Sequence, residues 1–210
     1  MARTRIKICG ITRGDDAAAA AACGVDAIGF NFYPGSARYV DPEDAMEIRR
    51  HLPAFVTCIG LFVDADSHEV AKISELLSLD LLQFHGNEGP DYCDAFNRPY
   101  IKAISAISGQ EICIQSDRFP RASGVLLDTP SAGQFGGSGK IFDWEVVPEL
   151  SMPVILAGGL NAENVGMAIR QVKPWAVDVS GGVESSKGIK DARLMEEFVE
   201  AVRDADGRSA

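Results

Sequence analysis

Residues 154–184 read VILAGGLNAENVGMAIRQVKPWAVDVSGGVE, and this stretch indicates the fold. A short apolar run at 154–157 precedes a helical pattern at 162–172, and a second apolar run follows at 176–179. A strand, a helix and a strand in this order pair in parallel through a right-handed crossover. Glycines follow both strands. The stretch therefore predicts one repeating unit of an α/β protein whose strands end in glycine-rich loops.

The same alternation runs along the whole chain. We expect strands at residues 5–9, 27–30, 55–62, 79–84, 100–104, 124–127, 154–157 and 176–179. We expect helices at residues 15–23, 42–51, 67–77, 90–96, 109–115, 144–150, 162–172 and 192–205. Eight such units favour a closed (β/α)8 TIM barrel over an open sheet. We expect one α/β domain at residues 1–206 and a frayed tail at residues 207–210.

Bulk composition narrows the range of partners. The 210 residues fit one domain, and the net charge of −10 opposes binding to nucleic acid or to an anionic membrane. No run reaches the length of about 20 apolar residues that a membrane span needs, and the first residues show no secretion signal. A phosphorylated small molecule is still compatible with this charge, because backbone amides bind phosphate locally.

Cysteine and histidine usage argues against disulfides and metals. The five cysteines are odd in number and form no CxxC motif. This pattern favours a reducing cytoplasm. Of the three histidines, only His85 ends an expected strand, so we expect no metal site.

Cys9 ends the first expected strand. Because side chains alternate along a strand, Lys7 and Cys9 should point into the barrel while Ile6 and Ile8 face the helices. Asp178, on the last strand, would then lie beside Lys7 when the barrel closes. Lys7 would favour the thiolate of Cys9. A reactive thiol and a small buried thiol that only packs are both compatible with this position.

Three more polar residues follow strands at the same end of the barrel. Asp128 ends an apolar run, where it is either an acid of the site or the cap of the next turn. Arg38 lies in a long loop and suits a planar carboxylate, unless it is simply solvated. His85 either contacts substrate or satisfies polar groups at the rim. We take Arg38, His85 and Asp178 as candidate substrate-binding residues.

Glycine clusters follow the last three expected strands and suggest phosphate binding. Glycine allows backbone N–H groups to approach an anion closely, although tight turns also need glycine. In this fold the seventh and eighth loops commonly bind phosphate. The candidate phosphate ligands are Gly136, Gly158, Gly159, Ser180, Gly181 and Gly182.

Taken together, the motifs resemble those of the phosphoribosylanthranilate isomerase family of tryptophan biosynthesis. In order, they are KICGIT at 7–12, GFNFYPGSARYV at 29–40, GLFVD at 60–64, LLQFHGNE at 81–88, LLDT at 126–129, GGSGKIFDW at 136–144, LAGGLNAENV at 156–165, DVSGGVE at 178–184 and GIKD at 188–191. Two positions depart from the family pattern. Gly181 stands where serine is usual, and Phe84 where leucine is common.

The resemblance implies an Amadori rearrangement of a phosphorylated aminosugar, N-(5′-phosphoribosyl)anthranilate, without cofactor or metal. It implies that Cys9 is the general base, that Asp128 is the general acid and that Arg38 binds the anthranilate carboxylate. It implies that the late glycine loops bind the phosphate. Whether the chain is a monomer or a homodimer is left open.

Two other interpretations compete with this one. Another phosphosugar barrel enzyme, such as an indole-glycerol-phosphate synthase or a ribulose-phosphate epimerase, would need an inward lysine acid with catalytic glutamates, or a metal site. A binding protein without catalytic activity would keep the glycine loops but would need neither Cys9 nor Asp128.

Overall fold

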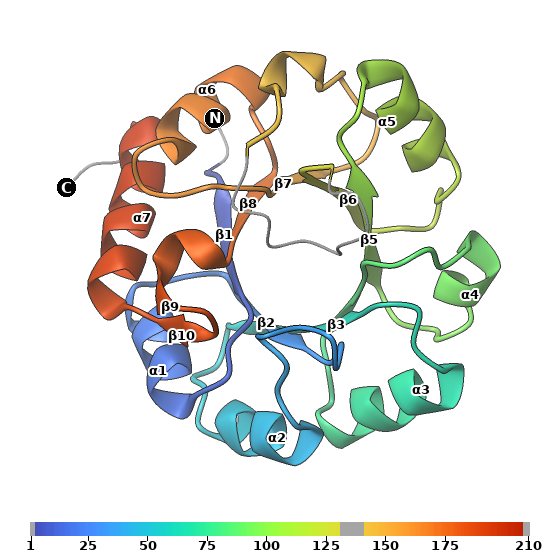
Figure 1. The fold of residues 1–210 in the computed structure, drawn as a ribbon, viewed down its shortest axis with the longest axis vertical. Coiled ribbons are helices and arrows are strands. Elements are labelled where there is room, and N and C mark those ends of the chain that lie inside the picture. The colour runs from blue at the N-terminus through green and yellow to red at the C-terminus, as the bar shows by residue number, and fades with distance from the viewer. Residues whose placement is uncertain (1–2, 131–140, 208–210) are drawn as a thin grey trace.

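The eight expected strands hydrogen-bond in sequence order, and the last pairs with the first, which closes the sheet. The protein is described here from a computed structural model that covers residues 3–130 and 141–207. Figure 1, which looks along the barrel, shows the strands as an inner ring surrounded by helices. The predicted (β/α)8 barrel is confirmed.

Each barrel strand begins and ends within two residues of its expected position. The strands are β1 (Arg5–Cys9), β2 (Ala27–Asn31), β3 (Thr57–Phe62), β4 (Leu81–Phe84), β5 (Tyr100–Ser105), β6 (Gly124–Asp128), β7 (Val154–Leu156) and β8 (Ala176–Val179). All neighbouring pairs are parallel. All eight strands therefore end at one face of the barrel, and the candidate residues lie there.

The outer ring consists of α1 (Gly14–Ala22), α2 (Pro42–Arg50), α3 (Ser67–Leu76), α4 (Pro90–Asp94), α5 (Gly109–Asp117), α6 (Val165–Val172) and α7 (Ala192–Ala205). Four of these helices start at side chains that accept backbone N–H groups of the first turn: Asp41, Asp66, Ser108 and Asp191. Such caps satisfy donors that have no partner within the helix. Local sequence chemistry therefore sets where these helices begin.

The expected helix at residues 144–150 is wrong. Only a single 3-10 turn, η1 (Trp144–Val146), forms there. Val147 is extended, with φ −75° and ψ 112°, and Pro148 follows it. A proline excludes the helical conformation from the residue before it and has no N–H to donate, so the helix cannot continue.

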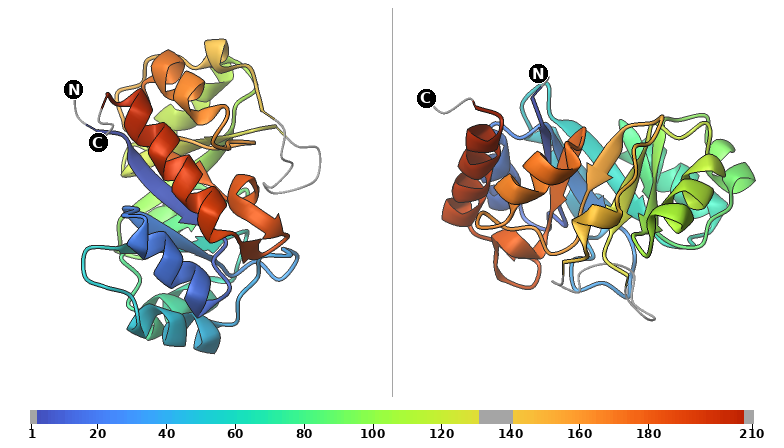
Figure 2. Two further views of the ribbon diagram at one scale, coloured as in Figure 1. Left: turned by 90° about the vertical axis from the view of Figure 1, so that its left-hand side faces the viewer. Right: turned by 90° about the horizontal axis from the view of Figure 1, so that it is seen from above.

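A short hairpin after β8 was not expected. It follows the 3-10 turn η2 (Gly181–Val183) and pairs β9 (Glu184–Ser186) with β10 (Ile189–Lys190) in antiparallel fashion. In the right-hand view of Figure 2 it protrudes from the end of the barrel opposite the N-terminus. The hairpin brings its side chains to the face that carries the candidate residues.

Apolar side chains fill two separate layers. The larger layer lies between strands and helices and includes Ile6 and Ile8, as the alternation predicts. A smaller cluster belongs to the opposite face of the strands, inside the barrel: Leu81, Ile101, Ala103, Leu126, Ile155, Ala157 and Ala176. This inner plug gives the residues at the barrel mouth a solid base.

The two ends of the chain are joined at the other face of the barrel. The backbone N–H and the hydroxyl of Thr4 donate to the carboxylate of Asp206 at 2.7 and 2.8 Å. Between these ends, α7 packs against α6 and α1 (Figure 1). The described residues thus include all eight barrel strands. The expected tail at 207–210 lies outside the described residues apart from Gly207.

None of the helices in the described ranges is long and apolar enough to cross a membrane.

Replacing Phe198 by alanine should destabilise the barrel. Phe198 is fully buried on α7, and such truncations typically cost about 3–5 kcal/mol. Urea unfolding followed by circular dichroism measures the change. Arg193→Ala is the matched control on the same helix, because its ion pair with Glu197 is exposed and should contribute less than about 1 kcal/mol. Equal stability of the two variants would contradict the role of α7 in closing the core.

Candidate active site

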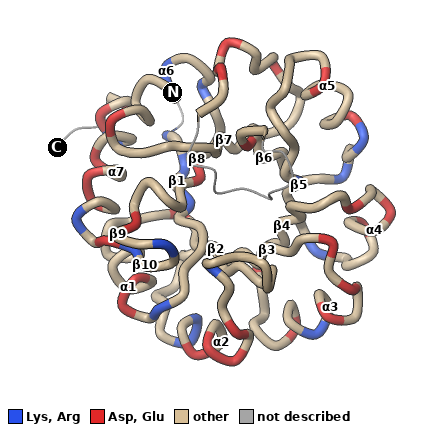
Figure 3. Tube along the Cα trace, viewed as in Figure 1, with Lys and Arg blue, Asp and Glu red and all other residues tan. Residues whose placement is uncertain are grey.

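Lys7 and Asp178 form an ion pair inside the barrel, at the junction of β1 and β8. The two residues are direct partners in the strand register, and Nζ lies 2.9 Å from Oδ1. Both side chains are less than a tenth exposed. Figure 3 shows the positive charge of β1 beside the negative charge of β8 on the barrel wall. The pairing expected from alternation and closure is present.

The pair is held in its ionised form. Burial alone would lower the pKa of Lys7, but the attraction of Asp178 and of Cys9 raises it. Burial also raises the pKa of Asp178, and Lys7 opposes this. We place the proton on Lys7, because a 2.9 Å contact between oppositely charged groups stabilises both charges.

Cys9 lies two residues after Lys7 on the same face of β1 and is also buried. Its neighbour on β2 is Gly29, where an added Cβ would come within 2.9 Å of the sulfur and 3.2 Å of Lys7 Nζ. The glycine thus leaves the room that both side chains occupy. Burial raises the pKa of the Cys9 thiol, and Asp178 raises it further, whereas Lys7 and Lys190 lower it. Lys7 favours the thiolate as predicted, but the effect of burial is larger, so the pKa of Cys9 is raised overall.

Asp128 and His85 form a second pair of polar residues at the same face. Asp128 Oδ2 lies 3.3 Å from His85 Nε2, and Oδ1 accepts the N–H of Thr129 at 2.8 Å. The second contact is the turn cap considered as the alternative role of Asp128. The other carboxylate oxygen faces the histidine, so the turn contact leaves one oxygen of Asp128 directed at the site.

Asp178 interacts electrostatically with members of both pairs. Its charge acts on Lys7, on Asp128 and on His85. Residues of β1, β6 and β8 and the residue that follows β4 are thus gathered around one volume at the barrel mouth. The structure brings together Cys9, Asp128, His85 and Asp178, as the strand positions predict.

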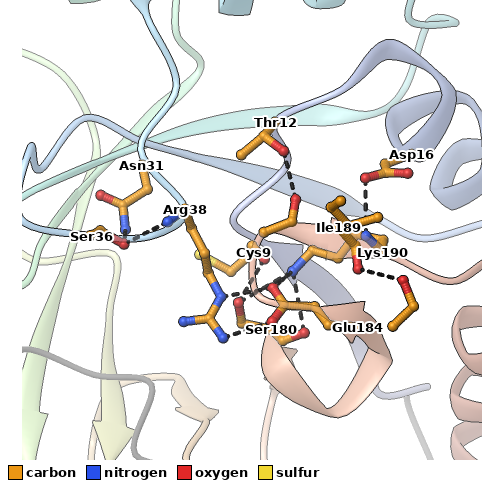
Figure 4. A network of polar contacts seen from close by, with 12 residues as sticks. Cys9, Thr12, Asp16, Asn31, Ser36, Arg38, Ser180, Glu184, Ile189 and Lys190 are labelled. Carbon is orange, nitrogen blue, oxygen red and sulfur yellow. Dashed lines mark hydrogen bonds and ion pairs between the residues drawn. The ribbon is translucent and has the colours of Figure 1, made fainter.

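Arg38 is bound by Glu184 rather than solvated. Its Nε and Nη2 donate to the two carboxylate oxygens at 2.7 and 2.8 Å (Figure 4), and these bonds raise the pKa of Arg38. The contact uses one edge of the guanidinium. Nη1 has no acceptor in the described part of the chain, so the end of the guanidinium can still bind a carboxylate through parallel hydrogen bonds.

Glu184 and Lys190 connect Arg38 to Cys9. Lys190 Nζ lies 2.8 Å from Glu184 Oε1 and 3.2 Å from the carbonyl oxygen of Ser180, and the Ser180 hydroxyl donates to the Cys9 carbonyl at 2.9 Å. Figure 4 shows these contacts as one network. Hydrogen bonds from Arg38 and Lys190 outweigh burial and lower the pKa of Glu184, while burial lowers the pKa of Lys190 despite Glu184.

The glycine loops after β7 and β8 pack directly on each other and on Asp128. Gly158 and Gly159 have positive φ angles of 84° and 64°. A Cβ at Gly158 would come within 2.8 Å of the Thr129 nitrogen, and a Cβ at Gly182 would overlap the Leu160 carbonyl. Only glycine fits this approach of two backbones, so the turn interpretation holds at both positions.

These loops also present donors. Within residues 3–130 and 141–207, no acceptor receives the backbone N–H of Gly158, Gly159, Gly181 or Gly182. Donors clustered in this way are the local chemistry that holds a phosphate. Gly136, the remaining candidate ligand, lies outside the described residues.

Sequence analysis missed Glu184, Lys190 and Gln83. The two charged residues occur in the motifs DVSGGVE and GIKD, but Arg38 is 146 positions away from Glu184, and no periodicity reports such a pairing. Gln83 occurs in the motif LLQFHGNE, to which no role was assigned at this position. A buried amide beside a histidine was the available signal.

The opposite end of the barrel has a different character. A cavity of about 640 Å³ lies there, lined by residues that include Arg3, Arg5, Pro148, Met152 and Trp175. None of the described candidate residues lines it. Among the residues that the structure describes, no group of three or more His, Cys, Asp or Glu side chains is arranged to hold a metal ion.

Comparison with known proteins gives one consistent family. Residues 6–201 match the family model described as N-(5′-phosphoribosyl)anthranilate (PRA) isomerase. The N-(5′-phosphoribosyl)anthranilate isomerase of Pseudomonas aeruginosa (strain LESB58) is 55% identical over 204 residues, which cover 97% of each chain.

Solved structures agree with the sequence match. A phosphoribosylanthranilate isomerase in complex with reduced 1-(o-carboxyphenylamino)-1-deoxyribulose 5-phosphate is 35% identical, with a TM-score of 0.82 over 97% of this chain and 99% of the other. Monomers generated from the dimeric enzyme of Thermotoga maritima are 33% identical, with a TM-score of 0.83 over 96% and 99% of the two chains.

Replacing Glu184 by glutamine should make the stability of the protein less sensitive to acid. Since the folded-state pKa of Glu184 lies below its ordinary value of 4.5, the ionised form stabilises the fold above that pH. This contribution is lost as the pH falls below 4.5 through the lowered pKa.

The variant should therefore be less stable at pH 7, at the lower end of the roughly 3–5 kcal/mol for a broken buried pair, and lose less stability between pH 5 and pH 3. Urea unfolding at each pH measures both effects. Glu197→Gln, in an exposed pair, is the control. An acid dependence equal to that of wild type would contradict the assigned pairing.

Proposed function

The chain belongs to the N-(5′-phosphoribosyl)anthranilate isomerase family, and from this premise we propose that it isomerises the substrate with Cys9 as general base and Asp128 as general acid. The reaction of tryptophan biosynthesis converts N-(5′-phosphoribosyl)anthranilate to 1-(2-carboxyphenylamino)-1-deoxyribulose 5-phosphate. The observation that carries the proposal is the gathering of Cys9, Asp178, His85 and Asp128 around one barrel mouth beside the glycine loops.

The three chemical parts of the substrate have matching partners. The backbone amides of the loops after β7 and β8 would bind the phosphate, through Gly158, Gly159, Gly181 and Gly182, which have no acceptor within the described residues, and through Ser180. The free end of the Arg38 guanidinium would bind the anthranilate carboxylate, and Glu184 fixes its orientation. The sugar between them would then lie over Cys9 and Asp128.

Asp128 would start the reaction by protonating the ring oxygen of the sugar. As the bond between C1′ and that oxygen breaks, its electron pair takes the proton and the anilino nitrogen forms a double bond to C1′. The product is an open-chain iminium ion. A positioned carboxylic acid typically accelerates such a step by about 10²–10⁴-fold.

Cys9 would continue the reaction in its thiolate form, by removing the proton on C2′ and becoming a thiol. The electron pair of that C–H bond forms the C1′=C2′ bond, and the electrons of the iminium bond return to nitrogen. Protonation of C1′ and loss of the C2′ hydroxyl proton then yield the ketone. Burial makes the thiolate a stronger base, since it raises the pKa of Cys9, and Lys7 stabilises the anion when it forms.

Several earlier expectations continue as predictions. They are location in the cytoplasm, catalysis without cofactor or metal, and a monomer or homodimer as the assembled form. The Thermotoga maritima relative is described as dimeric, with monomers generated from it.

Replacing either proposed catalytic group should abolish most turnover without preventing binding. We expect Cys9→Ser and Asp128→Asn each to lower kcat by at least about 10²-fold, while both still bind the product. Substrate fluorescence follows turnover, and calorimetry with the product measures binding. Cys113→Ser on α5 is the matched control and should keep wild-type kcat. Full activity of Cys9→Ser and Asp128→Asn would end the assignment.

Replacing Arg38 by lysine should mainly weaken substrate binding. An ammonium group keeps the charge but cannot engage Glu184 and a second carboxylate through two planar edges. We expect KM to rise by about 10–100-fold, the effect of losing about 1.4–2.7 kcal/mol of binding, with a smaller change in kcat. Steady-state kinetics give both values. An unchanged KM would show that the carboxylate binds elsewhere.

A further inference from the structure

Gln83 is a fully buried amide inside the barrel, two residues before His85 of the candidate site. It lies on β4, on the face shared by Leu81, which packs with the inner apolar cluster, and its side chain has no exposed surface. A buried amide is costly unless it is hydrogen-bonded. Its position in the apolar plug therefore calls for a role.

The amide of Gln83 contacts one atom of the site. Its Nε2 lies 3.0 Å from Nδ1 of His85, and its Oε1 is buried without a hydrogen-bond partner within the described residues. An amide nitrogen only donates, so the ring nitrogen that faces it must accept. Nδ1 therefore carries no hydrogen, and in a neutral imidazole the hydrogen lies on Nε2.

The opposite ring nitrogen faces the proposed acid. His85 Nε2 lies 3.3 Å from Asp128 Oδ2, so the hydrogen on Nε2 is next to the carboxylate. Gln83, His85 and Asp128 thus form a chain of three groups. The contact of Gln83 with His85 fixes which ring nitrogen carries the hydrogen, and therefore whether the nitrogen next to Asp128 is protonated.

We propose that Gln83 is a positioning residue that holds His85 as the neutral Nε2–H tautomer, so that the proton delivered to the sugar resides on Asp128 and not on the imidazole. The inference rests on the proposed function of Asp128. An imidazolium would need a second hydrogen on Nδ1, where the Gln83 N–H already points. A proton taken up by the pair is therefore directed to the carboxyl group.

The other charged groups near His85 do not replace this contact. Asp178 of β8 acts on the ring across the barrel. Lys102 of β5 binds the carbonyls of Phe84 and Gly86, which flank His85, together with Glu88. Asp64, after β3, accepts from Asn87. These bonds hold the loop after β4 in place, while Nδ1 is contacted by Gln83.

Nitrogen NMR of the ligand-free enzyme reads the tautomer directly. With ¹⁵N-labelled histidine, long-range ¹H–¹⁵N correlations distinguish a protonated from an unprotonated ring nitrogen. The chain has only three histidines, and the exposed His51 and His68 serve as internal references. We expect unprotonated Nδ1 and protonated Nε2 for His85 at neutral pH. A protonated Nδ1 in the wild type would overturn the proposal.

Gln83→Glu reverses the polarity of the contact with little change in shape. Its carboxylate accepts from Nδ1–H, so we expect the Nδ1 resonance to become that of a protonated nitrogen and kcat to fall at least about tenfold, with KM within about threefold. Gln83→Met removes the donor and should give a mixture of tautomers with an intermediate kcat. Gln115→Glu on α5 is the matched control and should change neither.

The outcomes separate this inference from the proposed function. The NMR measurement needs no turnover, so it remains decisive even if Gln83→Glu does not fold. An unchanged tautomer and kcat in Gln83→Met would refute the positioning role while Asp128→Asn could still be inactive. Full activity of Asp128→Asn would refute the proposed acid instead.

Discussion

The ion pair between Lys7 and Asp178 is the interaction on which the active face depends. It joins the first strand to the last, in direct register, where the barrel closes. Removing two charges from water costs several kcal/mol per ion, so such a pair adds little net stability compared with an apolar contact. Its importance lies in its field. The charge of Lys7 opposes the effect of burial on the pKa of Cys9. The charge of Asp178 acts on the residues at the ends of β4 and β6.

Closure in this register also brings distant loops together. The loop after β2 carries Arg38, and the hairpin after β8 carries Glu184 and Lys190. The carboxylate of Glu184 binds both cations near Cys9. Each cation has an acidic partner, so the charges lie at fixed positions before any ligand binds. Preorganised charges of this kind favour catalysis because little reorganisation is needed during the reaction.

Alternation along single strands predicted which residues face inward. It placed Lys7, Cys9 and Asp128 at the barrel mouth and Ile6 and Ile8 against the helices, because side-chain direction in a strand depends only on position parity. The helix expected at 144–150 failed because apolar spacing was read without weighing Pro148. The β9–β10 hairpin was missed because strands of three and two residues are too short to show a period.

The sequence by itself determined the fold class, the family and the strand ends that carry the site, since all of these follow from local periodicity and contiguous motifs. Only the tertiary structure decided the contacts of the functional groups. Arg38 and Glu184 are 146 residues apart, and His85 after β4 meets Asp128 of β6 across the intervening strand β5. Such pairings depend on barrel closure and on burial, which no local pattern encodes. The pKa of Cys9 depends on the same closure, because Asp178 of β8 and Lys190 of β10 shift it together with Lys7 of its own strand.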